Sequence, residues 1–155
     1  MALREQFNEQ LKEAMKAKDN RRVSTLRMVL AALKDKDIAA RTETNREGIS
    51  DDDVLGLLAK MIKQREESAT AFRTGNRPEL AQAEEEEVAI IRAFMPKQMD
   101  ADEARSAIQS VIAEVGAASM KDMGKVMAAL KERYAGQMDF AKASGTTKEL
   151  LSAPK

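Results

Sequence analysis

Residues 50–78 read SDDDVLGLLAKMIKQREESATAFRTGNRP, and this stretch decides the fold class. Its apolar residues recur at spacings of three and four, which is the period of an α-helix rather than of a strand. Ser50 and the aspartates after it are typical of a helix start, where a cap and negative charge suit the free N–H groups. Gly75-Asn76 is typical of a helix end, and Pro78 fits the first turn of another helix. The stretch therefore predicts one long helix and the start of the next.

The rest of the chain has the same period. Its commonest residues are good helix formers, whereas the aromatic residues are four Phe, one Tyr and no Trp. We interpret the apolar stripes as helix-to-helix core, with Leu80 and Met95 among the inward positions of the fourth helix. Gly145-Thr-Thr147 is expected to weaken the last helix. Further helices are predicted over about residues 2–18, 20–40, 78–95 and 100–115, and after the caps Ser119 and Asp139.

Pro96 marks the boundary between two helical domains. Proline lacks an N–H group and ends a helix, and the helices predicted after it are shorter. We predict an N-terminal helical domain over residues 1–95 and a small three-helix tail domain over residues 97–155. The predicted fold class is therefore all-α.

The composition excludes several kinds of chemistry. The 155 residues include no Cys and no His, so no disulfide, thiol nucleophile, Cys/His zinc site or imidazole base is available. Neither Gly-rich phosphate loop occurs, whether G-x-x-x-x-G-K-[ST] or G-x-G-x-x-G. We expect no metal and no cofactor, and binding rather than catalysis.

No segment predicts a membrane span or a targeting signal. The first residues, MALREQ, contain no apolar h-region. The longest apolar run is far shorter than the roughly 18 residues that a span requires. We therefore expect a cytoplasmic protein that contacts no membrane.

The net charge of zero hides an uneven distribution. The 26 basic and 26 acidic residues balance over the whole chain. Residues 1–41 have a net charge of +4, residues 42–100 of −5 and residues 101–155 of +1. A basic start, an acidic middle and a slightly basic tail leave room for a local phosphate-binding patch.

Basic residues cluster between the first two predicted helices. Two interpretations are open: a patch that contacts phosphates, or charges that face solvent or pair with the acidic helices next in sequence. The candidate residues there are Lys16, Lys18, Arg21 and Arg22.

The run Glu84-Glu85-Glu86-Glu87 is the clearest acidic feature. No basic residue follows four positions after any of these glutamates, so pairing within the helix is poor. A cation site or an electrostatic latch is one interpretation. A solvated face, or long-range pairing with Lys and Arg of the first two helices, is the other.

A second candidate site lies in the tail. Its Lys and Arg side chains surround two predicted helix ends, where backbone N–H groups also attract phosphate. Tyr134 supplies a ring that can stack on a base or ribose. The alternative is a helical hairpin interrupted by glycine, with Tyr134 at the boundary of the core. The basic candidates are Lys125, Lys131, Arg133 and Lys142.

Several motifs in order give the chain a resemblance to the YqeY family, the stand-alone relatives of the tail of the GatB subunit of tRNA-dependent amidotransferases. The resemblance covers about residues 2–152. It is carried by Ala14-Met-Lys-Ala-Lys-Asp19, Arg27-Met-Val-Leu-Ala-Ala-Leu-Lys34, Lys63-Gln-Arg-Glu-Glu-Ser68, Phe72, Gly75, Arg77, Phe94-Met-Pro96-Lys-Gln98, Gly116, Asp122-Met-Gly-Lys-Val-Met127 and Gly136-Gln-Met-Asp139.

The resemblance implies an all-helical N-terminal domain, a small helical tail and a role in contacting tRNA. The family is associated with carbon–nitrogen ligation that uses glutamine as amide donor. Because this chain has no nucleotide site and no glutaminase nucleophile, we expect no autonomous catalysis. The competing hypothesis is a protein-interaction module that docks a synthetase or another protein of the aminoacylation or amidation machinery. Direct amidotransferase activity is the weakest hypothesis.

Overall fold

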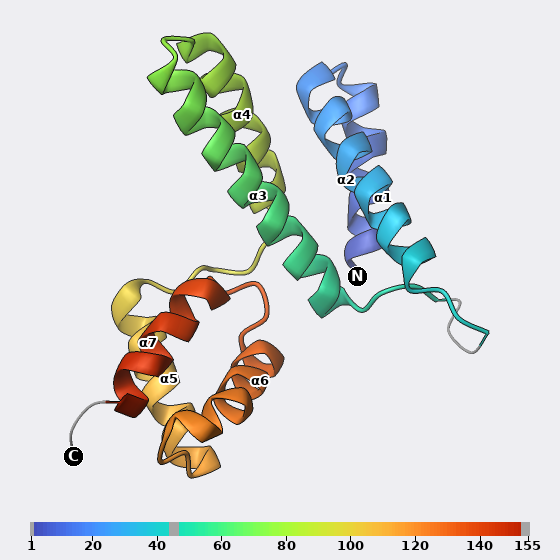
Figure 1. The fold of residues 1–155 in the computed structure, drawn as a ribbon. Helices are drawn as coiled ribbons and strands as arrows, with labels where there is room; N and C mark the ends of the chain where they lie inside the picture. Colours follow the sequence, from blue (N-terminus) through green and yellow to red (C-terminus); the bar gives the residue numbers. More distant parts are fainter. Residues whose placement is uncertain (1, 44–46, 153–155) are drawn as a thin grey trace. The chain divides into compact units, whose positions relative to one another are not determined.

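A computed structural model describes residues 2–43 and 47–152 of the chain. These residues form seven α-helices and one short 3-10 helix, and no strand occurs among them (Figure 1). The predicted all-α fold class is therefore confirmed. None of the described helices has both the length and the apolar character that crossing a membrane requires. The elements are α1 (Leu3–Lys16), α2 (Asn20–Ala39), α3 (Asp51–Thr74), α4 (Pro78–Arg92), α5 (Ala101–Val115), η1 (Met120–Asp122), α6 (Met123–Arg133) and α7 (Phe140–Ser152).

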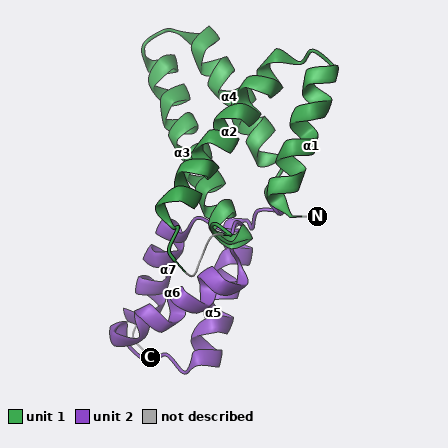
Figure 2. Ribbon diagram, turned by 90° about the vertical axis from the view of Figure 1, so that its right-hand side faces the viewer, with its two compact units in different colours: residues 1–95 green, residues 96–155 purple. Residues whose placement is uncertain are grey.

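The contacts divide the chain into two compact units (Figure 2). Residues 1–95 form the N-terminal unit, which contains α1 to α4. Residues 96–155 form the tail unit, which contains α5, η1, α6 and α7. Each unit has its own cluster of buried apolar side chains.

The N-terminal unit consists of two helical hairpins, α1–α2 and α3–α4, with α2 packed against α4. Phe7 of α1 is fully buried, and its ring meets that of Phe94 edge to face with centroids 4.8 Å apart. Burial of apolar side chains from all four helices contributes most of the stability of such a unit. The core side chains are Leu3, Phe7, Val29, Leu33, Val54, Leu58, Met61, Ile62, Val88 and Ile91.

An ionic cluster ties α1 and α2 to the start of α3. The Arg4 guanidinium donates to Asp37 at 2.6 Å and to the carbonyl of Ile49 at 2.8 Å. The Ile49 N–H donates to the same Asp37 oxygen at 2.9 Å. Gly48 has a φ of 91°, and a Cβ at that position would lie 2.3 Å from the Asp37 carboxylate. The backbone approaches Asp37 this closely only because residue 48 is glycine.

The tail unit packs α5, α6 and α7 around Ile108, Val111, Val126 and Leu130, which are fully buried. Met138 and Ala143 complete this core from the α6–α7 connection and from α7. The three helices contact one another pairwise, so each covers part of the same apolar centre.

Most predicted helix starts are confirmed, because they depend on local caps. The Ser50 hydroxyl accepts from the N–H of Asp53 at 3.2 Å, and Asp19 accepts from Arg22 at 3.2 Å. Asp100 and Glu103 form a reciprocal capping box at the start of α5.

Three details differ from the sequence predictions. Helix α4 ends at Arg92 rather than at Pro96, because a residue before proline avoids the helical conformation and the last turn tightens. Leu80 is exposed, and its neighbour Ala81 is buried instead. Helix α6 begins at Met123, after the 3-10 turn that Ser119 caps.

Helix α7 is continuous through Gly145-Thr-Thr147, so the expected weakness at this point does not interrupt it. Thr147 is fully buried, and its hydroxyl donates to the carbonyl of Ala143 at 2.8 Å. The buried hydroxyl is thereby satisfied within the helix. The loop predicted at residues 41–48 includes residues 44–46, which lie outside the described residues.

Candidate nucleic-acid interface

The nine candidate residues lie in two places. Lys16, Lys18, Arg21 and Arg22 lie at the α1–α2 turn of the N-terminal unit. Lys125, Lys131, Arg133, Tyr134 and Lys142 lie on α6, at its end, or at the start of α7 in the tail unit. Each group is considered within its own unit.

In the tail, the α6–α7 turn of residues 134–139 brings two lysines to its two sides. Lys131 lies in the last turn of α6, and Lys142 lies in the first turn of α7. Both side chains are exposed, and neither forms an ion pair within the described part of the tail. Their ammonium groups are therefore available to a partner.

The shape of this turn depends on Gly136. This residue is buried and has a φ of 74°, a conformation that glycine adopts without steric cost. The N–H of Gln137 donates to the carbonyl of Tyr134 at 2.9 Å and closes the turn. Asp139 then accepts from the N–H groups of Ala141 at 2.9 Å and Lys142 at 3.4 Å. Because this carboxylate occupies the first amides of α7, the lysine side chains rather than the helix N-terminus are the groups open to phosphate.

Arg133 and Tyr134 are partly committed to the fold. Arg133 forms an ion pair with Glu114 of α5, and this carboxylate raises the pKa of the guanidinium above its ordinary value. Tyr134 is half-buried and packs against the tail core, as the core-boundary interpretation expects. The residue as a whole remains partly exposed.

Lys125 does not join Lys131 on one face. The two residues are six positions apart on α6, which separates them by about 9 Å along the axis and about 120° around it. Lys125 lies near Asp122, whose pKa is lowered mainly by the N–H of Ala118 and also by the charge of Lys125. Lys125 therefore belongs to the opposite end of the helix from the α6–α7 turn.

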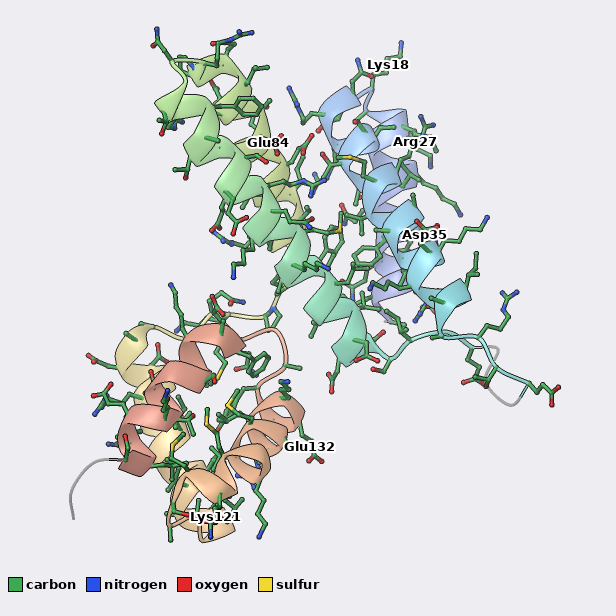
Figure 3. All side chains as sticks on the ribbon, viewed as in Figure 1. Lys18, Arg27, Asp35, Glu84, Lys121 and Glu132 are labelled. Atoms are coloured by element: carbon green, nitrogen blue, oxygen red, sulfur yellow. The ribbon has the colours of Figure 1, made fainter. Side chains whose placement is uncertain are left out.

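At the α1–α2 turn, the four candidates have different surroundings. Lys16 and Lys18 are exposed, and Lys18 ends the helix with a φ of 58° (Figure 3). Arg21 pairs with Glu86 at 3.4 Å and with Glu87 at 4.0 Å. Arg22 is half-buried, and its Nε lacks a hydrogen-bond partner among the described residues. Of the four candidates, only the two lysines are both exposed and without an ion pair within the described residues.

The acidic run on α4 pairs with arginines of other helices. Glu85 accepts from Arg73 of α3 at 2.7 Å, and Glu87 accepts from Arg65 of α3 at 2.9 Å. Glu87 also reaches Arg21 of α2, so one carboxylate joins three helices. Long-range pairing therefore accounts for Glu85, Glu86 and Glu87, whereas Glu84 forms no ion pair within the described residues. Of these partners only Arg21 lies on the first two helices, where the sequence placed them, and Arg65 and Arg73 lie on α3. No group of three or more acidic side chains within the described residues is arranged to hold a metal ion.

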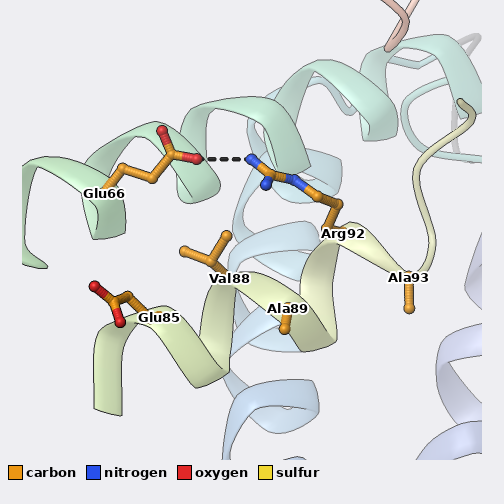
Figure 4. A pocket seen from close by; sticks show the side chains of 6 residues that line it. All are labelled: Glu66, Glu85, Val88, Ala89, Arg92 and Ala93. Carbon is orange, nitrogen blue, oxygen red and sulfur yellow. Dashed lines mark hydrogen bonds and ion pairs between the residues drawn. The ribbon is translucent and has the colours of Figure 1, made fainter. Parts of the chain in front are cut away.

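A shallow hollow of about 530 Å³ lies between α3 and α4 (Figure 4). Its floor includes Val88 and Ala89, and an ion pair of Glu66 with Arg92 at 2.7 Å crosses one side. Glu85 lines the other side and is already paired with Arg73. The hollow offers apolar contact more than free charge.

Sequence reasoning missed a contact between the α6–α7 turn and the segment before α5. The side-chain amide of Gln98 donates to the carbonyl of Gly136 at 2.5 Å, and the N–H of Met99 donates to Gln137 at 2.8 Å. Both segments belong to motifs that carry the family resemblance. Nothing in their separation of 38 residues, however, predicts that they meet.

Four helices in one compact unit and three in the next define a small two-unit all-α protein. The family model described as Yqey-like protein matches residues 4–151. The chain therefore belongs to the YqeY family, which confirms the resemblance.

Curated relatives carry the name altered inheritance of mitochondria protein 41, mitochondrial. The protein of Lachancea thermotolerans is 37% identical over 94 residues, which are 61% of this chain and 48% of the relative. The protein of Vanderwaltozyma polyspora is 34% identical over 85 residues, 55% of this chain and 44% of the relative. The protein of Clavispora lusitaniae is 35% identical over 85 residues, 55% of this chain and 46% of the relative. The chain spans less than half the length of each of these proteins.

Proposed function

We propose that the chain is a tRNA-contacting accessory module, related to the tail of glutamine-dependent amidotransferases and without autonomous catalysis. The observation that carries the proposal is the α6–α7 turn, where Lys131 and Lys142 are exposed and form no ion pair in the described part of the tail. Unpaired lysines around a hydrogen-bonded turn suit a phosphate backbone, because they can bind phosphates and release counterions without breaking an ion pair. Membership of the YqeY family supports the same assignment.

The candidate residues have unequal parts in this proposal. Lys131 and Lys142 contact phosphates, and the ring of Tyr134 stacks on a base or ribose. Lys16 and Lys18 supply a second set of free charges in the N-terminal unit. Arg21 and Arg133 contribute less, because a partner must compete with Glu86, Glu87 and Glu114 for them.

The test is the affinity for bulk tRNA as a function of salt. Binding followed by fluorescence anisotropy is expected to weaken about 10³-fold or more between about 50 mM and about 200 mM salt if six or more phosphates are contacted, and less for a smaller footprint. Lys131→Gln and Lys142→Gln should each reduce the salt slope by about one. Lys148→Gln, on the same helix α7 as Lys142, is the matched control and should leave the slope unchanged. Absence of binding at low salt contradicts the proposal.

A second candidate function is docking of a protein partner, and the hollow between α3 and α4 is the observation that favours it. Its apolar floor suits a small apolar side chain of the partner. A complex that persists after nuclease treatment and is lost in Ala89→Glu would support docking over RNA binding.

Location in the cytoplasm remains a prediction.

A further inference from the structure

The segment Pro96–Met99, which precedes α5, lies along the α6–α7 turn. The Gln98 side-chain amide donates to two carbonyls, that of Pro96 at 2.9 Å and that of Gly136 at 2.5 Å. The Met99 N–H donates to the carbonyl of Gln137 at 2.8 Å. Two consecutive residues of the segment therefore bond to two consecutive residues of the turn.

These hydrogen bonds fix the position of the backbone around Lys97. The next two residues are anchored, and Met99 also packs against the tail core. Lys97 itself is exposed and forms no ion pair within the described residues. Its charge acts on the nearby Asp100, whose pKa is lowered mainly by the N–H of Glu103 and in small part by Lys97. The backbone that carries Lys97 is thus held next to the turn, and the residue is exposed to solvent.

We propose that Lys97 belongs to the phosphate-contacting surface of the tail and that Gln98 is the positioning residue that holds it there. This inference rests on the proposed function and extends its site. Three segments then contribute one lysine each: Lys97 before α5, Lys131 at the end of α6 and Lys142 at the start of α7. A polyanion that follows the turn meets all three charges.

The role of Gln98 follows from the chemistry of its side chain. The two hydrogens of one amide group serve the two carbonyls, and a glutamate of the same shape has no hydrogen to donate at neutral pH. Gln98→Met keeps the length and removes both donors. The Lys97 segment then loses its side-chain bond to the turn and keeps only the bond of the Met99 N–H, although Lys97 itself is unchanged.

The experiment is a double-mutant cycle on the affinity for bulk tRNA, with Lys97→Gln, Gln98→Met and the double variant. Lys97→Gln should reduce the salt slope by about one, as expected for one lost phosphate contact. Gln98→Met should lower the affinity. The double variant should bind no more weakly than the single variant that has the larger loss of affinity, because both changes act on the same contact. Gln109→Met, on the exposed side of α5, and Lys148→Gln are the controls and should match the wild type.

The possible outcomes separate the inference from the proposed function. If the wild type binds tRNA and Lys97→Gln binds equally well, Lys97 is not part of the surface. If the effects of Lys97→Gln and Gln98→Met add, Gln98 does not position Lys97 and that half of the inference is wrong. If the wild type does not bind tRNA at any salt, the proposed function itself fails.

The variant Gly136→Ala tests the same contact by changing the turn residue whose carbonyl accepts from Gln98. It should lower the affinity for tRNA as Gln98→Met does.

Discussion

The N-terminal unit and the tail unit use their basic residues in different ways. In the described part of the N-terminal unit, arginines pair with carboxylates of other helices, and the Arg65–Glu87 pair is largely buried, with side-chain exposures of 13% and 16%. In the described tail, the two pairs Arg105–Glu149 and Arg133–Glu114 lie at the surface, with exposures between 44% and 68%. The first unit thus has one ion pair that is largely buried between helices, whereas both ion pairs of the described tail join helices at the surface.

This difference teaches how to interpret a chain of zero net charge. The acidic α4 is neutralised by Arg21, Arg65 and Arg73, which lie on α2 and α3. The lysines of the described residues form no such pairs. Arginine suits interhelical pairing because its planar guanidinium offers several donors to one carboxylate, whereas lysine is more readily left hydrated.

The largest expected effect compares the two cores. Leu58 of α3 and Leu130 of α6 are both fully buried, so Leu58→Ala and Leu130→Ala should each cost about 2–5 kcal/mol. The change in Leu130 should remove a larger share of its unit's stability, because the tail is the smaller unit. Hydrogen exchange measured by mass spectrometry should rise in α1 to α4 for Leu58→Ala and in α5 to α7 for Leu130→Ala. An equal rise of hydrogen exchange in both units of one variant would contradict the expectation that each core stabilises its own unit.

The next effect compares the two kinds of ion pair. Glu87→Ala leaves the partly buried Arg65 with one remaining backbone acceptor, so it should cost about 1–3 kcal/mol of unfolding free energy. Glu114→Ala removes the surface partner of Arg133, and no measurable loss of stability is expected. Replacing both partners of the buried pair, as in Arg65→Met with Glu87→Leu, should recover much of the loss. Urea unfolding checks all three, and equal losses for Glu87→Ala and Glu114→Ala would contradict the contrast.

The smallest effect is a dependence on pH. The Arg4 hydrogen bond, with help from the Ile49 N–H, lowers the pKa of Asp37 below its ordinary value. A lowered pKa stabilises the fold above the ordinary value of the unfolded chain, and that contribution is lost as the pH falls through the folded value. Asp37→Asn should therefore cost about 1–2 kcal/mol near pH 7 and progressively less below about pH 4.

Asp100→Asn in the tail is the control for this effect. The pKa of Asp100 is also lowered, mainly by the N–H of Glu103, but asparagine caps a helix about as well as aspartate. Its unfolding curve should stay close to that of the wild type at neutral pH. A cost for Asp37→Asn that stays constant down to pH 2 would show that the Asp37 charge plays no part.

The helices and their caps were predictable because each depends on residues within four positions. Ser50, Asp19 and Asp100 each cap the helix that begins at the next residue. Helix α4 ends at Arg92, before the predicted end near residue 95, because Pro96 disfavours the helical conformation in the residue before it. In the candidate site, Lys131 and Lys142 follow from the pattern of helix ends, whereas Lys97 and Gln98 do not.

The sequence by itself determined that this chain is helical, where most helices begin, and that His and Cys chemistry is absent. The tertiary structure decided which charged side chains form ion pairs and which remain unpaired. Glu87 meets Arg65 and Arg21, and Gln98 meets Gly136, across separations that no helical period encodes. The physical reason is that periodicity and capping are local, whereas pairing between helices depends on their packing and register, which the whole core sets.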